Sequence, residues 1–386
     1  MRLIYLDNAA STPVDPTVRE AMLPFIEEQF ANPSTRYASG VRAAEALDKA
    51  RRQIQQALDA RDDRVIFTGG GTETNNLAIL GAARSRGAGQ VLIGSTEHTS
   101  VRRPAEALIR EGFRVESLPL TDKGAIDMDA ALAMVGTETR VIAHMLVNNE
   151  VGALYRIAEF FRAAKAKAPH AHLHVDCIQG LGKIDISLDT LNADSMAISG
   201  HKIHGPKGVG ALILRKDARL LPIIFGGSHE GGLRAGTENV AFIAGLAQAV
   251  RMAVQSRTSF LKSARQCQDL LLAGLQELDG VLAMTSEQAV DSIVTVRVPG
   301  APGEVWQHHL EAYGLEVGVG SACQSKSGEI SPALKALGLT DSEARQVLRV
   351  SFSRMTTPED VQALVDGLKT LHPKLSQTST QTPSAS

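Results

Sequence analysis

The chain has 386 residues, of which 44% are hydrophobic, so it can bury a large core. We expect two domains within one globular body of the size of an enzyme. The 40 Lys and Arg residues nearly balance the 42 Asp and Glu residues, giving a formal net charge of -2. Because no basic stripe is present to follow a phosphate backbone, direct binding to nucleic acid is not expected.

Cysteines and apolar runs narrow the class of protein further. Cys177, Cys267 and Cys323 are too few and too widely separated for a disulfide framework or a paired-cysteine metal site. No apolar run approaches the roughly 18 residues that a membrane span needs. We therefore expect a soluble, cytoplasmic protein without membrane contact, in which a single reactive thiol remains possible.

The N-terminal part predicts a short strand at residues 3–6, helical spacing from Val18 until Asn32, and a second helix over residues 41–58. From Arg64 onward, strands alternate with helices. This spacing is typical of a parallel sheet with crossover connections.

A glycine turn at residues 69–71 follows the strand predicted at 64–68 and leads into a helix for which Thr72 is the expected cap. The first N–H groups of a helix lack partners, and the helix dipole favours negative charge, so a phosphate would fit here. An ordinary strand-to-helix turn explains the glycines equally well. The segment matches neither of the common nucleotide-binding motifs, so a nucleotide loop is not supported.

Two polar residues follow later apolar strands. His98 lies beyond the strand predicted at 90–93, and Asn149 lies beyond the one at 141–147. Ligand-binding groups in such sheets gather at the carboxyl ends of strands. Taken alone, each residue is better explained as structural.

Residues 169–176 alternate between polar and apolar positions, which places three histidines and Asp176 on one face of a strand. A hydrolytic zinc site would need further ligands and a general base, and no HExxH or CxxC motif supplies them. We therefore expect no metal. The competing interpretation makes Asp176 a cofactor-binding group at the strand end, with Gln179 one turn beyond and Cys177 packed as a small apolar residue.

Lys202 lies in a polar, glycine-punctuated turn, residues 199–208, between two apolar runs. A lysine next to core strands is costly unless it is paired, neutral or covalently engaged. A Schiff base with an aldehyde cofactor would remove that cost. Considered alone, Lys202 is more often a solvated turn residue.

The C-terminal part follows a glycine-dense loop at 226–237 and one long, kinked helix expected over 238–278. Strands are predicted at 292–296, 315–317 and 348–352. Glycine and serine on both sides of Cys323 predict a flexible, exposed loop, an unusual setting for a free cysteine. Arg349 is a candidate for binding a carboxylate, and a surface arginine is the alternative.

Seven segments in this order resemble the cysteine desulfurases, the NifS-like pyridoxal-phosphate enzymes of the class V aminotransferase family. The resemblance extends from Leu3 to about Leu371, and its motifs are YLDNAA at 5–10, TETNN at 72–76, EH at 97–98, NNEVG at 148–152, HVD at 174–176, SGHK at 199–202 and GSAC at 320–323. Seven separated matches are far more specific than any one of them.

The resemblance implies a dimeric α/β protein of the fold-type-I architecture, with a mainly parallel sheet between helices and a smaller α+β domain. The expected large domain covers residues 14–250, and the small domain covers 1–13 and 251–373 and carries the mobile Cys323 loop. Residues 374–386 are expected to form a disordered tail.

The resemblance also assigns roles to residues of the pyridoxal 5'-phosphate site. Lys202 would form the Schiff base, Asp176 would pair with the pyridine nitrogen, His98 would stack on the ring, and Cys323 would be the nucleophile. Arg349 would bind the substrate carboxylate, aided by Asn149. The remaining cofactor residues implied are Gln179 and Asn149 at the ring oxygen side, Gly71, Thr72, Ser199 and His201 at the phosphate, and Thr237 from the partner subunit.

The activity implied is conversion of L-cysteine to L-alanine, with sulfur carried on Cys323 as a persulfide and then passed to an acceptor protein. Lys202 would act as base at Cα, and His98 would assist proton transfer near the thiol. Iron–sulfur cluster assembly, tRNA thiolation and DNA phosphorothioation all remain open as destinations. The rival functions are another fold-type-I enzyme, namely an aminotransferase or selenocysteine lyase, and a non-catalytic, cofactor-bound scaffold in a sulfur-transfer complex.

Four positions depart from the pattern of the resembled family. Tyr37 replaces a common histidine, Cys177 replaces an alanine, Gly231 replaces an arginine, and Gly318 with Val319 replaces a serine pair. None is expected to touch a catalytic role, although dimer contacts or acceptor docking could change.

Overall fold

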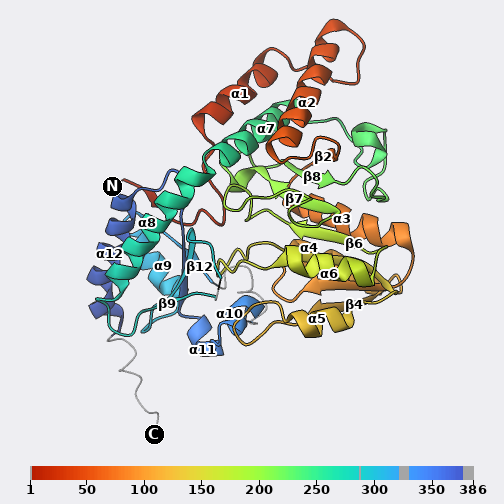
Figure 1. The fold of residues 1–386 in the computed structure, drawn as a ribbon. Helices are drawn as coiled ribbons and strands as arrows, with labels where there is room; N and C mark the ends of the chain where they lie inside the picture. The colour runs from red at the N-terminus through yellow and green to blue at the C-terminus, as the bar shows by residue number, and fades with distance from the viewer. Residues whose placement is uncertain (1, 287, 321–329, 377–386) are drawn as a thin grey trace.

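A computed structural model describes residues 2–286, 288–320 and 330–376 of the chain. Its largest element is a seven-stranded sheet in the order β2-β8-β7-β6-β5-β3-β4 (Figure 1). All neighbouring pairs from β7 to β4 are parallel, and β8 runs antiparallel to both β7 and β2. The strands are β2 (Arg64–Thr68), β3 (Gln90–Gly94), β4 (Arg114–Leu118), β5 (Thr139–Met145), β6 (His172–Asp176), β7 (Ser195–Ser199) and β8 (Gly210–Leu214).

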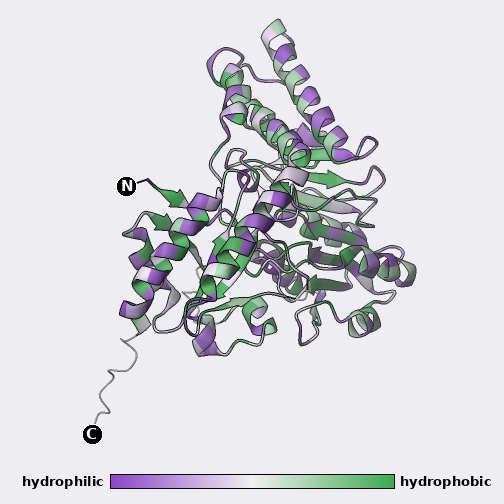
Figure 2. Ribbon diagram, turned by 60° about the vertical axis from the view of Figure 1, so that its left-hand side comes forward, coloured by the Kyte–Doolittle hydropathy of each residue, from purple (hydrophilic) through white to green (hydrophobic). Residues whose placement is uncertain are grey.

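Helices cover both faces of this sheet. Alternate strand residues point to opposite faces, and on one face they pack with α3 (Gly71–Arg86) and α4 (Thr99–Ile109). On the other face they join the core cluster that contains α1 (Pro16–Glu27), α2 (Ala38–Ala57), α6 (Ile157–Lys167) and α7 (Val240–Gln255). Strands buried on both faces should be apolar throughout, and Figure 2 shows mainly hydrophobic strands in this sheet. The short α5 (Met128–Met134) lies near α6 and β4.

A second sheet lies in the C-terminal part, in the antiparallel order β12-β13-β10-β9. Its strands are β9 (Leu282–Met284), β10 (Ile293–Arg297), β12 (Gly318–Val319) and β13 (Val347–Ser351). The N-terminal β1 (Ile4–Tyr5) pairs in parallel with β11 (Leu315–Glu316). The helices of this part are α8 (Arg257–Leu275), α9 (Gly303–Glu311), α10 (Pro332–Ala336), α11 (Asp341–Ala344) and α12 (Pro358–Ser376).

The second sheet has a core of its own, which includes Leu6 from the N-terminus and the fully buried Trp306. Figure 1 shows α8 and α12 beside this sheet, away from the seven-stranded one. The second sheet and its helices therefore correspond to the predicted small domain, which contains both the N-terminal strand and the C-terminal part of the chain. The boundaries drawn at residues 13 and 250 stay a prediction.

Three local predictions differ from the structure. The long helix expected over 238–278 is two helices, α7 and α8, separated at Ser256. Thr72 lies inside α3 and is not its cap, because the chain enters the helix through Gly70, whose φ of 139° suits glycine. Finally, α12 continues to Ser376, so the first residues of the expected tail are helical. The rest of the tail lies outside the described residues.

Candidate active site

A cavity of about 370 Å³ lies at the carboxyl ends of the parallel strands and brings most of the predicted site residues together. The loops after β3, β5, β6 and β7 meet at this edge, as expected for a ligand site in such a sheet. The predicted residues that line it are Gly71, Thr72, His98, Asn149, Asp176, Gln179, Ser199, His201, Lys202 and Arg349.

Two predicted residues are not among those that line the cavity. Thr237 lines a different cavity together with Glu230 and Arg234, so its assignment to the partner subunit's site stays a prediction. Cys323 lies outside the described residues. The strand before it, β12, ends at Val319 beside β13, which carries Arg349.

Lys202 comes from the short 3-10 turn Gly200–Lys202 that directly follows β7. Its Nζ donates hydrogen bonds to the backbone oxygens of Ala9 at 2.7 Å and Ala10 at 2.8 Å. The N-terminal segment therefore holds the amine at the cavity wall, a contact that the spacing of residues along the chain does not predict.

Asp176 is the last residue of β6 and is 6% exposed. Its Oδ2 accepts a hydrogen bond from Asn75 Nδ2 at 2.8 Å, and its Oδ1 accepts one from the Ile178 N–H at 2.9 Å. Burial raises the pKa of Asp176, while these two donors and the charges of His98 and Lys202 lower it. A cationic group bound in the cavity would further favour the carboxylate.

His98 caps α4, and its Nδ1 accepts a hydrogen bond from the Ser100 N–H at 3.1 Å and lies 2.8 Å from Ser100 Oγ. With Nδ1 as acceptor, the neutral ring carries its proton on Nε2. Burial lowers the pKa of His98, as does the charge of Lys202, while Asp176 raises it. The ring is therefore neutral near pH 7 and can take up or release a proton.

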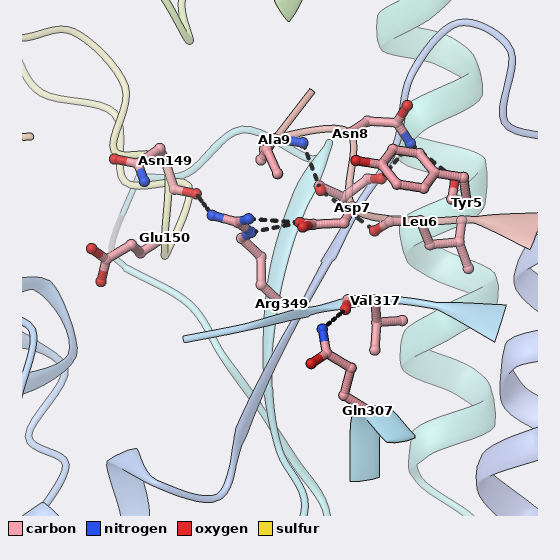
Figure 3. Close-up of polar contacts among 12 residues, drawn as sticks. Tyr5, Leu6, Asp7, Asn8, Ala9, Asn149, Glu150, Gln307, Val317 and Arg349 are labelled. Atoms are coloured by element: carbon pink, nitrogen blue, oxygen red, sulfur yellow. Dashed lines mark hydrogen bonds and ion pairs between the residues drawn. The ribbon is translucent and has the colours of Figure 1, made fainter. Parts of the chain in front are cut away.

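Arg349, on β13, lies between the N-terminal segment and the loop after β5 (Figure 3). Its Nε and Nη2 donate to Asp7 Oδ1 at 3.0 and 2.6 Å, and its Nη1 donates to the Asn149 backbone oxygen at 2.9 Å. These bonds use three of the five guanidinium N–H groups. The other two have no hydrogen-bond partner among the described residues and can bind a carboxylate at the cavity.

Three residues of the site escaped the sequence analysis. Asp7 orients Arg349, Asn75 supports Asp176, and Lys183 donates to Gln179 Oε1 at 2.7 Å. Burial, with the charges of Lys202 and Arg349, lowers the pKa of Lys183 to about 7. Asp7 and Asn75 both lie in motifs that carry the resemblance. The sequence therefore marked these two positions, but it did not indicate what their side chains do.

The departures in the sequence include one that touches this site. A Cβ on Gly318 would lie 2.5 Å from Asp7 Oδ1 and 3.0 Å from Arg349 Nε. The glycine therefore leaves room for the Asp7–Arg349 pair, so this departure lies against a predicted substrate-binding residue, and the expectation that no departure touches a catalytic role stays a prediction. Elsewhere, Tyr37 is 59% exposed ahead of α2, Cys177 is fully buried, and Gly231 has a φ of 64° that suits glycine.

The histidine-rich strand is not arranged as a metal site. His170 lies before β6 and is exposed, so it does not share a strand face with the other two as predicted. Within residues 2–286, 288–320 and 330–376, no group of three or more His, Cys, Asp and Glu residues is placed to hold a metal ion. His172 and His174 instead contact Ser195.

Buried histidines predict sensitivity to acid. Burial lowers the pKa of His174 to about 3 and that of His144 to about 4. Both bind protons in the unfolded chain below about pH 6.5, so the native state is disfavoured as the pH falls from there toward pH 4. The free energy of unfolding should fall by about 1.4 kcal/mol per pH unit for each such histidine.

Urea denaturation between pH 7 and pH 5 measures this dependence. His174→Gln should remove about one proton's share of the slope, and replacing the exposed His170 by glutamine is the matched control. A slope that is the same in His174→Gln and in the wild type would contradict the assignment.

Comparisons with known proteins agree with this geometry. The profile of the aminotransferase class-V family matches residues 4–364, so the chain belongs to this family. It is 36% identical to "Cysteine desulfurase IscS 1" of Archaeoglobus fulgidus, over 94% of this chain and 95% of that protein. It is 39% identical to "Cysteine desulfurase IscS" of Serratia proteamaculans, over 93% of this chain and 90% of that protein.

Solved structures give the same family. A "NIFS-LIKE PROTEIN" superposes with a TM-score of 0.89 at 30% identity, covering 97% of this chain and all of that one. A structure described as "SspA in complex with cysteine" superposes with a TM-score of 0.80 at 32% identity, covering 90% and 98% of the two chains. The predicted fold class, a mainly parallel α/β sheet with a smaller α+β part, is confirmed.

Proposed function

We propose that this protein is a pyridoxal 5'-phosphate-dependent cysteine desulfurase that converts L-cysteine to L-alanine and transfers the sulfur to Cys323 as a persulfide. The observation that carries the proposal is the meeting of Lys202, Asp176, His98 and Arg349 at one cavity. These residues come from distant parts of the chain, and each has a separate task in this reaction. The identity to curated cysteine desulfurases over nearly the full chain supports the same activity.

The donor set of the cavity fits the cofactor. At one side, α3 begins at Gly71 without a side-chain cap, so its first N–H groups are available to a phosphate, with Thr72, Ser199 and His201 nearby. Burial beside Lys202 and Lys207 lowers the pKa of His201 to about 4, so the ring is a neutral donor. At the other side, Asp176 supplies a buried carboxylate for a protonated ring nitrogen.

Bound pyridoxal 5'-phosphate supplies an aldehyde that links covalently to an amine and a ring that accepts electrons when a substrate bond to Cα breaks. Lys202 would hold the aldehyde and move the proton at the substrate Cα. Asp176 would keep the ring nitrogen protonated, and His98 would stack on the ring and move a proton near the substrate thiol. Gln179 and Asn149 would lie on the ring oxygen side.

Arg349 would bind and orient the substrate carboxylate through its two remaining N–H groups, next to the Asn149 backbone. The Cys323 thiolate would then attack the substrate sulfur. A sulfur–sulfur bond would form on Cys323 as the carbon–sulfur bond of cysteine breaks, and the electron pair of the broken bond would leave with the carbon, which takes up protons to become L-alanine. Only a few per cent of an unperturbed thiol is ionised at pH 7, so a neighbouring base is needed.

We also propose a homodimer in the cytoplasm that passes sulfur to an acceptor protein, with iron–sulfur cluster assembly as the pathway. The exposed apolar side chains Leu221, Ile224 and Phe225, the last 83% exposed, support a subunit contact. Thr237, which does not line the cofactor cavity of its own chain, would then reach the cofactor cavity of the partner subunit. Among the described residues, no helix is both long enough and apolar enough to cross a membrane.

The experiment that tests the proposed activity is addition of L-cysteine to the purified protein with pyridoxal 5'-phosphate. We expect L-alanine in solution and, by mass spectrometry, the mass of one added sulfur atom on the peptide that contains Cys323. A Cys323→Ser variant is the control and must carry no such adduct. An oxo acid as product, or an unmodified Cys323 with full turnover, would favour the aminotransferase alternative.

A further inference from the structure

A line of buried polar side chains runs from the interior of the large sheet to the cavity. His172 Nε2 lies 2.8 Å from Ser195 Oγ, which lies 2.8 Å from His174 Nδ1. His174 Nε2 lies 3.0 Å from Asn75 Oδ1. His172, His174, Ser195 and Asn75 are all fully buried, and of these only Asn75 has been given a role above, as a support of Asp176.

The direction of these hydrogen bonds follows from the chemistry at the cavity end. Asp176 Oδ2 can only accept when ionised, so the Asn75 side chain must turn its Nδ2 toward it. The second proton of the same Nδ2 is donated to Ser100 Oγ, which lies 2.8 Å away. Asn75 Oδ1 is thus left as an acceptor, and it requires a proton on His174 Nε2.

The rest of the line is then determined. A neutral His174 with its proton on Nε2 has a lone pair on Nδ1, so Ser195 must donate its hydroxyl proton there. Ser195 Oγ in turn accepts from His172 Nε2. His172 Nδ1 is left as a bare acceptor, and it is a buried atom without a hydrogen-bond partner among the described residues.

The opposite arrangement would put protons on both nitrogens of His174. Burial opposes this, because it lowers the pKa of His174 to about 3 and that of His172 well below its usual range. Both rings are therefore neutral, and every donor in the line points toward the cavity.

The line branches at Asn75 and reaches a second cavity residue. Ser100 Oγ accepts from Asn75 Nδ2 and is 2.8 Å from His98 Nδ1. Its own proton is free to be donated to that nitrogen, which leaves the proton of His98 on Nε2. One amide therefore contacts Asp176 directly and His98 through a single hydroxyl.

We propose that His172, Ser195, His174 and Asn75 form a one-way chain of hydrogen-bond donors that keeps Asp176 ionised and supports the His98 tautomer that the Ser100 N–H selects. This inference rests on the proposed function, because it gives these positioning residues a role in holding the cofactor ring. The polar face of β6 is thus used to orient the site.

Two substitutions of His174 distinguish a role in this hydrogen-bond chain from a role in packing alone. A glutamine can place its amide N–H where Nε2 lies and still donate to Asn75, whereas an asparagine is too short to do so and reaches only toward Ser195. We expect His174→Gln to bind pyridoxal 5'-phosphate as tightly as the wild type. We expect His174→Asn to bind it roughly tenfold more weakly, because it leaves the buried Asn75 oxygen without a donor.

The readouts are the dissociation constant for pyridoxal 5'-phosphate, measured by titrating the cofactor-free protein, and the absorption spectrum of the bound cofactor against pH. A weaker hold on Asp176 should shift the pH dependence of the spectrum in His174→Asn and leave it unchanged in His174→Gln. Equal affinities and spectra in the two variants would overturn the inference. A wild-type protein that bound no cofactor would overturn the proposed function itself, a distinguishable result.

A substitution at another position in the chain tests the inference if both histidine variants fail to fold. Ser195→Ala removes the hydroxyl that holds the tautomer of His174 and should weaken cofactor binding by about threefold with the same spectral shift. Ser292→Ala is the matched control, since this buried serine lies directly before β10, away from the cavity, and its Oγ has no hydrogen-bond partner among the described residues. Identical affinity and spectra for Ser195→Ala and Ser292→Ala would contradict the chain.

Discussion

Replacement of Lys202 by alanine is expected to abolish covalent attachment of pyridoxal 5'-phosphate and to lower the rate of L-alanine formation by at least about 10³-fold. A positioned general base alone contributes roughly 10²- to 10⁴-fold, and this variant loses the covalent link as well. The amine also donates to the Ala9 and Ala10 oxygens, but those groups lie at a partly exposed wall, so the protein should still fold.

Alanine formation and retention of the cofactor after denaturation are the two measurements for this variant. Lys207→Ala is the matched control, because Lys207 lies in the same turn, is exposed and does not line the cavity. If Lys202→Ala formed L-alanine at the wild-type rate, Lys202 would not be the catalytic residue, and the proposed site would be wrong.

Asp176→Asn is expected to lower kcat by roughly 10²- to 5 × 10³-fold and to change the KM for cysteine much less. The substitution keeps the size of the side chain but removes the charge that is proposed to hold a proton on the ring nitrogen. Loss of one partner of a buried charged pair costs about 3–5 kcal/mol, and each 1.36 kcal/mol in the barrier is about tenfold in rate. Asp176 contacts Asn75 and the Ile178 N–H, so its effect on substrate binding is indirect.

Steady-state kinetics with cysteine measures the effect of Asp176→Asn. Asp185→Asn is a suitable control, since Asp185 is an exposed aspartate that pairs with Arg257 on the surface. A kcat for Asp176→Asn within a few fold of the wild type would mean that the carboxylate is not used in catalysis.

Much of the large sheet could be predicted from the sequence, because strands buried on both faces are continuous apolar runs. Residues 64–68 were predicted as a strand and form β2. The reversed direction of β8 was not predicted, since an apolar run carries no information about the direction of its neighbours.

The site was predictable to the extent that its residues follow strands or resemble a known pattern. Lys202 and Asp176 were identified in this way, and both line the cavity. The contact of Asp7 with Arg349 joins residues 342 positions apart, and no periodicity reports such a pairing. The role of Asn75 was missed for a related reason, because it depends on side chains from β6, β7 and α4 that only the fold brings together.

The N-terminal strand has a consequence for the synthesis of the protein. Asp7 is made well before its partner Arg349, which belongs to β13 and lies 342 positions further along the chain. Lys202 and Asp176 are present long before that guanidinium. A nascent chain therefore cannot use Arg349 in the carboxylate-binding role proposed for it until β13 has been made and the segment around Asp7 has paired with it.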